Sequence, residues 1–123
     1  MRKERFDQDK LKVLEWFQKY AHGYKNARTR DDIIPFIQLP DRYFREIASS
    51  LIHDGHIASS CDKGYWFIPL FTKDRREVEA VIKCHIERKS KALDLIKDCD
   101  KLIQQFEDRL VVTTQGQREF VGV

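Results

Sequence analysis

The stretch of residues 30–68, RDDIIPFIQLPDRYFREIASSLIHDGHIASSCDKGYWFI, decides the fold. Pro40 cannot lie in the interior of a helix, so a first short helix is predicted to end shortly before it. Asp41 is a predicted N-cap for a second helix, because its carboxylate can accept a hydrogen bond from a free amide of the first turn. This second helix is predicted to run to about Asp54, since Gly55 suits the left-handed conformation that often ends a helix.

The predicted second helix has two faces. Apolar residues recur at the three- and four-residue spacings of a buried stripe: Phe44, Ile47, Ala48 and Leu51. The other face is mostly polar and rich in hydrogen-bond donors: Arg42, Tyr43, Arg45, Glu46, Ser49, Ser50 and His53. Arginine can bind guanine through two hydrogen bonds in the major groove, and hydroxyls can reach bases or phosphates. The same pattern also fits an amphipathic helix with a solvated face, so the helix alone leaves both interpretations open.

A two-stranded hairpin is predicted to follow the second helix. Residues 56–59, HIAS, and 65–68, YWFI, have the composition of strands, and residues 60–64, SCDKG, that of a turn. Side chains alternate along a strand, so Trp66 is predicted to lie on the face opposite Tyr65. Three positions for the Trp66 ring compete: under a long C-terminal helix, in a subunit interface, or stacked on a base.

The order of helix, turn, helix and hairpin, over about residues 11–69, resembles the winged helix-turn-helix domains of small DNA-binding proteins, particularly the phage-associated type. The resemblance rests on the Asp54-Gly55 break and on the Ser59-Ser60 and Lys63-Gly64-Tyr65 segments of the hairpin, or wing. It implies that the second helix enters the major groove of duplex DNA. The residues expected in that groove are Arg42, Tyr43, Arg45, Ser49 and Ser50. The residues expected on the phosphates are Lys25, Arg28 and Arg30, with Lys63 at the wing tip on a phosphate or in the minor groove.

The segments before this stretch give a further helix and a cap. A helix is predicted from Asp9 to about His22-Gly23, with residues 1–8 outside it. Thr29 is a predicted N-cap of the short helix. Pro35 is predicted to shorten or kink that helix.

A long helix is predicted after the hairpin, capped by Thr72 and running to about residue 110. Its seam alternates by three and four residues through Val78, Ile82, His85, Lys89, Ala92, Ile96, Cys99, Ile103, Phe106 and Leu110. A single helix of this length cannot bury such a seam, so it either packs back on the first domain or pairs with a second copy. We favour a homodimer, with dimerisation through Ile82, Ile96, Cys99, Ile103 and Phe106.

The predicted fold class is mainly α with a small β-hairpin, a winged helix plus a long C-terminal helix. The predicted divisions are a winged helix-turn-helix domain at residues 1–71, the long helix at 72–110 and a tail at 111–123. The tail, VVTTQGQREFVGV, is expected to be a short strand or a disordered end.

Composition limits the class of protein. The 123 residues carry a formal net charge of +3 and a pI of about 8.8, so charge that binds DNA has to come from local placement. No apolar run has the length of a membrane span, and the N-terminal MRKERFDQDK lacks the apolar core of a signal peptide. The three widely spaced cysteines indicate reduced thiols and a cytoplasmic location.

The sequence offers little catalytic chemistry. It has no glycine-rich phosphate loop and no C-x-x-C pair. His53, His56 and Cys61 lack the usual ligand spacing and a fourth ligand, so we predict no metal site and no cofactor. Cys84 and His85 are neighbours on a helix and point about 100° apart, which excludes a nucleophile–base pair. We therefore predict that the chain is not an enzyme.

These observations predict sequence-specific binding of double-stranded DNA by a small dimeric protein, either a transcriptional regulator or a phage or plasmid replication-associated factor. The alternative is a winged-helix module that binds another protein and makes no direct DNA contact. The modest charge, the acidic neighbours on the second helix and the aromatic strand all fit this alternative. A continuous positive band favours DNA, whereas a mixed surface with an exposed apolar patch favours a protein partner.

Overall fold

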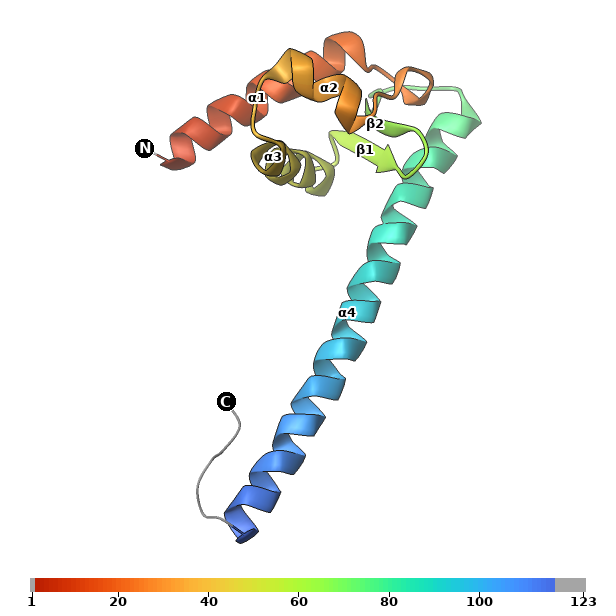
Figure 1. The fold of residues 1–123 in the computed structure, drawn as a ribbon. Helices are drawn as coiled ribbons and strands as arrows, with labels where there is room; N and C mark the ends of the chain where they lie inside the picture. The colour runs from red at the N-terminus through yellow and green to blue at the C-terminus, as the bar shows by residue number, and fades with distance from the viewer. Residues whose placement is uncertain (1, 117–123) are drawn as a thin grey trace. The chain divides into compact units, whose positions relative to one another are not determined.

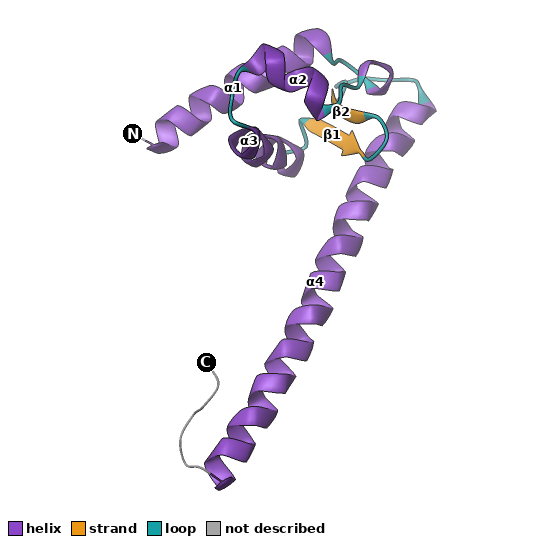
Figure 2. Ribbon diagram, in the orientation of Figure 1, coloured by secondary structure: helices purple, strands orange, loops and turns teal. Residues whose placement is uncertain are grey.

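The computed structural model describes residues 2–116, with side chains up to residue 110 (Figure 1). In chain order the elements are α1 (Arg2–Tyr20), the 3-10 turn η1 (Tyr24–Asn26), α2 (Arg30–Ile37), α3 (Asp41–His53), β1 (Ile57–Ser60), β2 (Gly64–Phe67) and α4 (Arg75–Gly116). The predicted fold class is confirmed: mainly α, with a two-stranded antiparallel hairpin and a long C-terminal helix (Figure 2). The chain divides into two compact units, the first ending at His85 and the second beginning at Ile86.

The core of the first unit lies between α1, α2, α3 and the hairpin. All four residues of the predicted α3 stripe are buried, which confirms the periodicity: Phe44, Ile47, Ala48 and Leu51. They form one cluster with Phe17 of α1 and Ile33 of α2. Phe17 is at the centre, with ring centroids 6.4 Å from Phe44 and 6.3 Å from Tyr65. Burial of each large apolar side chain in this cluster stabilises the fold by about 1.5–3 kcal/mol, so the cluster holds α3 in place.

The turn between α2 and α3 has the predicted form. The Thr29 hydroxyl accepts a hydrogen bond from the Asp32 amide at 3.3 Å, so the predicted N-cap of α2 is confirmed. Pro35 lies inside α2, and the helix ends two residues later at Ile37. Gln38 then adopts a left-handed conformation with φ of 57°, which turns the chain toward Pro40.

The caps of α3 are partly as predicted. The N-cap is Pro40 and not Asp41, which is the first helical residue, and no side chain makes a capping hydrogen bond. The prediction failed because the Asp41 carboxylate pairs with arginine side chains, as described below, rather than with the backbone amides. At the other end Asp54 is the C-cap, and Gly55 follows with φ of 82°, as predicted.

β2 has neighbours on both edges. On one edge it pairs with β1 in an antiparallel register that places Ala58 opposite Trp66. On the other edge, Arg28 and Tyr65 exchange two backbone hydrogen bonds of 2.8 and 2.7 Å. The Phe67 amide also donates to the Ala21 carbonyl. The segment between α1 and α2 therefore completes the sheet, a pairing that the sequence did not predict.

α1 begins earlier than expected. We predicted that residues 1–8 lie outside the helix, but α1 starts at Arg2 and ends at Tyr20. The extra turns have a tertiary partner, because the Phe6 ring contacts the Tyr43 ring edge to face at 6.0 Å. Lys10 further along α1 forms an ion pair with Asp54 at the end of α3. These contacts explain why a polar N-terminal segment is helical.

The first turns of α4 belong to the first unit. The predicted cap at Thr72 is wrong. Asp74 immediately precedes the helix, and its carboxylate accepts a hydrogen bond from the Arg76 amide at 2.9 Å. The Thr72 hydroxyl instead accepts from the backbone amide of Asp74. Glu77 is only 6% exposed, and its carboxylate accepts from the Tyr24 amide. The bond between Tyr24 and Glu77 fixes the start of α4 against η1.

Trp66 is fully buried in the core of the first unit. Its ring meets Tyr24 edge to face at 5.2 Å. The same core contains Cys84 of α4, whose sulfur accepts a hydrogen bond from the Ser59 amide at 3.5 Å. Of the three positions considered for Trp66, this burial favours packing under the start of the long helix and contradicts stacking on a base.

In the second unit, the residues that the structure describes form one element, the continuation of α4 to Gly116. The prediction of a non-helical tail from residue 111 is therefore wrong for residues 111–116. Residues 117–123, the rest of that tail, lie outside the described residues.

Candidate nucleic-acid interface

The buried stripe of α3 determines which of its side chains point outward. In a helix of 3.6 residues per turn, the positions opposite the stripe are those of Arg42, Glu46, Ser49 and His53. All four are exposed. Arg45 is exposed as well, on the flank nearer to Asp41. The outer face thus offers guanidinium, hydroxyl and imidazole groups, with Glu46 as one acidic member.

Tyr43 and Ser50, predicted on the same face, lie on its other flank and are partly buried. The Tyr43 hydroxyl donates a hydrogen bond to the Asp9 carboxylate at 2.7 Å. This hydrogen bond is the main cause of a raised pKa of Tyr43. Desolvation and the negative charge of Asp9 raise it further. The Tyr43 hydroxyl is therefore already engaged in a contact with α1.

Asp41 joins two of the predicted arginines. Its two carboxylate oxygens lie 3.2 Å from the Nε of Arg30 and 3.2 Å from the Nε of Arg45. All three side chains are about half exposed. Exposed ion pairs contribute about 0–1 kcal/mol each, so a phosphate group can compete with Asp41 for either arginine. The turn thus brings Arg30 of α2 beside the α3 surface, with an acidic group between the two cations.

The sheet lies close to these three charges. Burial raises the pKa of the Tyr65 hydroxyl. The positive charges of Arg30 and Arg45 act in the opposite direction, and the negative charge of Asp41 adds to the increase. Tyr65 is on β2, and its ring also meets Phe44 of α3 edge to face at 5.6 Å. The arginine pair therefore lies on the side of α3 that faces the hairpin.

The lysines predicted to contact phosphates gather around η1 and the hairpin turn. The Lys63 ammonium lies 5.4 Å from the centre of the Tyr24 ring. Lys25, the residue after Tyr24, has its Nζ 4.0 Å from the Asp74 carboxylate and is largely exposed. The second basic group is therefore defined by Tyr24, since Lys63 of the hairpin turn lies over its ring and Lys25 follows it in η1.

Arg28 joins neither group. Its Nε donates to the Tyr20 carbonyl at 3.4 Å, and its side chain lines a hollow with Trp16, Tyr20, Asp32 and Phe36. The structure therefore places this predicted phosphate contact beside α1.

The predicted dimerisation residues all lie on α4. Ile82, in the first unit, is about half exposed. In the second unit, Ile96, Ile103 and Phe106 are about half exposed, and Cys99 is an exposed free thiol. None of the five takes part in the core of the first unit.

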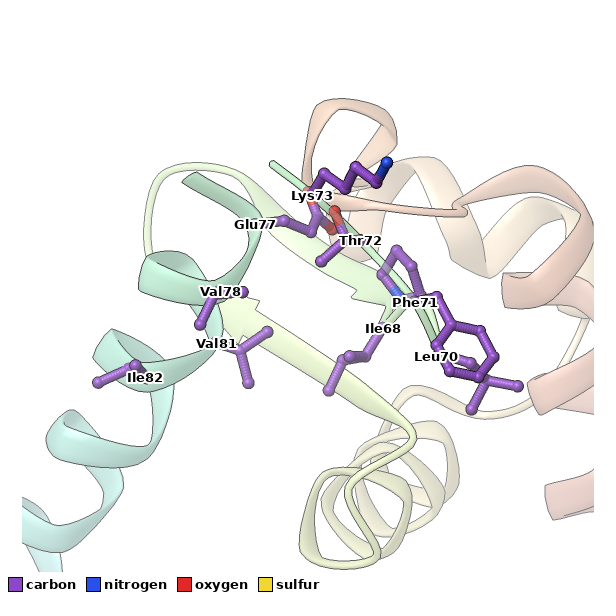
Figure 3. A pocket seen from close by; sticks show the side chains of 10 residues that line it. Ile68, Leu70, Phe71, Thr72, Lys73, Glu77, Val78, Val81 and Ile82 are labelled. Carbon is purple, nitrogen blue, oxygen red and sulfur yellow. The ribbon is translucent and has the colours of Figure 1, made fainter. Parts of the chain in front are cut away.

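An apolar hollow between the end of β2 and α4 was missed by sequence reasoning (Figure 3). Its lining is Ile68, Pro69, Leu70, Phe71, Thr72, Lys73, Glu77, Val78, Val81 and Ile82. Leu70 and Phe71 are 87% and 94% exposed. The sequence does contain one indication of this hollow. Leu70 and Phe71 are two consecutive large apolar residues in a predicted loop, where polar residues are usual.

Among the described residues, no group of three or more His, Cys, Asp or Glu side chains could hold a metal ion. None of the described helices combines the length and the apolar character that crossing a membrane requires.

Comparison with known proteins identifies no relative: no protein-family model, no curated protein and no solved structure matches the chain.

Proposed function

We propose that this chain binds double-stranded DNA through the outward face of α3. The observation that carries the proposal is the position of α3, whose buried stripe turns Arg42, Arg45 and Ser49 to solvent. The tight turn before α3 brings Arg30 beside it.

The dimensions and chemistry of α3 fit a major groove. Its 13 residues make a rod of about 20 Å, and a groove about 12 Å wide admits one α-helix. Arg42 and Ser49 lie two turns apart, so both can reach base edges along the groove. We assign Arg30 and Arg45 to phosphates beside the groove, and Lys63 and Lys25 to further phosphates.

Such sequence-specific binding suits a transcriptional regulator or a phage or plasmid replication-associated factor. The resemblance to winged helix-turn-helix domains supports this class, because the element order is the one that the resemblance implies. In this arrangement the side chains on α3 read the sequence, while the arginines and lysines around it fix the protein on the backbone.

The test is fluorescence anisotropy of a labelled duplex pool, titrated with the full chain and with the Arg42→Ala/Arg45→Ala variant. We expect the variant to bind at least tenfold more weakly, since each arginine contact to DNA contributes about 1–3 kcal/mol. The matched control is Lys91→Ala/Lys97→Ala, which removes the same charge from the second unit. Equal weakening in both variants would show that α3 is not the DNA-binding element.

A second candidate function, docking of a protein partner, is favoured by one observation. The hollow between the end of β2 and α4 is lined by the exposed side chains of Leu70 and Phe71 and by Val78 and Ile82 of α4. Exposed apolar patches of this kind often mark protein-binding surfaces. The variant Phe71→Ser separates the two functions, because duplex affinity should stay unchanged if α3 alone binds DNA.

A further inference from the structure

The second unit exposes a continuous apolar stripe along α4. Between residues 86 and 110, its large apolar side chains are 46% to 63% exposed. They are Ile86, Leu93, Leu95, Ile96, Leu102, Ile103, Phe106 and Leu110. A helix that exposes this much apolar surface gains stability by burying it against another surface.

Four of these residues, Ile96, Ile103, Phe106 and Leu110, have the spacing of a coiled-coil seam. Taking Ile96 as position a of a heptad, Ile103 and Leu110 are the next two a positions, and Cys99 and Phe106 are the d positions between them. With Ala92 at the preceding d position, six consecutive seam positions carry no polar side chain. This is the sequence pattern of a helix that packs against a similar helix.

We propose that this face of α4 binds a second copy of α4, side by side and in parallel. The charges permit such pairing, because residues 86–110 contain six basic and six acidic side chains and two copies do not repel each other. Identical seams also match in length and in position. The proposal extends the proposed DNA binding to an assembly with two binding units, but it does not depend on DNA.

Parallel pairing follows from the residues at and beside the seam. Among parallel coiled coils, isoleucine at position a together with leucine at position d favours two strands. Ile96 and Ile103 meet the first condition, while Cys99 and Phe106 occupy position d, so the direction of pairing rests on the flanking positions. In parallel pairs the flanking g and e positions meet, which places Leu95 against Asp100 and Leu102 against Glu107, without any like-charged pair. An antiparallel pair that keeps the same six layers would bring the two Asp100 carboxylates together near the twofold axis.

The apolar part of the seam begins after Lys89. Lys89 occupies an a position one heptad before Ile96, and a single lysine there fixes register at some cost in stability. We therefore place the tightly packed part of the pair at residues 92–110.

The experiment measures mass and crosslinking of the full chain without DNA. Light scattering should give twice the chain mass of 14.7 kDa at micromolar concentration. For crosslinking, the Cys61→Ser variant keeps Cys99 as the exposed thiol, because Cys84 is buried. A mild copper–phenanthroline oxidation should then produce a covalent dimer, since equivalent d positions face each other in a parallel pair.

Direction is tested with thiols at one end of the seam. In the Cys61→Ser/Cys99→Ser background, Leu110→Cys should crosslink strongly, whereas Gln105→Cys on the outer face should not. In an antiparallel pair two residues at position 110 would lie far apart, so a dimer that fails to crosslink through Leu110→Cys contradicts the parallel arrangement. A mass of one chain contradicts the pairing altogether.

Charge substitutions test whether the seam is the interface. Ile96→Asp/Ile103→Asp should convert the dimer to a single chain, while Lys91→Asp/Lys97→Asp, on the outer face, should leave the mass at two chains. If both variants remain dimeric, the seam is not the interface.

Discussion

The Asp41 carboxylate lies 3.2 Å from the Nε of Arg30, so an ion pair joins the first turn of α3 to the first residue of α2. The same carboxylate contacts Arg45 one turn further along α3. In the free protein it therefore holds two cations that the proposed function assigns to DNA phosphates. Asp41 therefore competes with DNA phosphates for Arg30 and Arg45, and removing its charge should strengthen DNA binding.

Asp41→Asn should strengthen duplex binding about three- to tenfold. The substitution removes one negative charge from the interface and releases Arg30 and Arg45 from pairs that contribute about 0–1 kcal/mol each. The measurement is the dissociation constant for one duplex at fixed salt, compared with the Asp94→Asn control in the second unit. Unchanged or weaker binding would show that these arginines do not contact DNA.

Glu77→Ala should destabilise the first unit by about 1–3 kcal/mol, because it leaves the Tyr24 amide without its acceptor in a partly buried position. The matched variant Glu79→Ala changes an exposed glutamate two residues away and should cost less than about 0.5 kcal/mol. Urea unfolding followed by tryptophan fluorescence measures both. Equal stability of the two variants would mean that Glu77 does not anchor α4.

Gly64→Ala should destabilise the hairpin by about 1–3 kcal/mol more than Gly55→Ala. Both glycines have positive φ, 93° and 82°, so the backbone strain of an alanine is similar at the two sites. Only at Gly64 does an added Cβ meet other atoms, since it would lie 2.2 Å from the Arg28 carbonyl oxygen. Thermal unfolding compares the pair. Equal melting temperatures of the two alanine variants would show that the Arg28 carbonyl does not crowd a side chain at position 64.

Stability should fall in acid in part through Asp54. The hydrogen bond from Lys10 lowers the pKa of Asp54 below its usual value. A lowered folded-state pKa contributes stability at pH values above the unfolded-state pKa, near 4, and this contribution is lost as pH falls through the folded-state value. Lys10→Met should therefore be less stable than the wild type above about pH 5, and the difference should shrink below pH 4. Urea midpoints between pH 3 and 7 measure it; a difference independent of pH would exclude this linkage.

The central part of the fold was predictable because its signals are local. The α3 stripe, the turn before Pro40 and the break at Gly55 each depend on a few neighbouring residues. Periodicity and restricted backbone conformations act over one or two turns, and a single sequence contains them in full.

The remaining features depend on contacts between distant residues. α1 extends to Arg2 because Phe6 meets Tyr43, and β2 gains a second neighbour because Arg28 pairs with Tyr65. A polar segment and a loop do not reveal such partners in the sequence.

For the candidate site, the sequence identified the outward residues of α3 but not the surroundings that modify them. It did not indicate that Asp41 pairs with Arg30 and Arg45, that Tyr43 bonds to Asp9, or that Arg28 lies beside α1. Each depends on side-chain directions that only the packed structure fixes.

The most direct test of DNA binding by α3 is the affinity of the unmodified chain for a duplex of about 30 base pairs at several salt concentrations. The account predicts binding at 50 mM salt that weakens linearly on a logarithmic scale as salt rises, by about 0.9 in slope for each phosphate contacted. The slope should decrease in the Arg30→Ala variant. Absence of binding at 50 mM salt, or an affinity that does not change with salt, would contradict it.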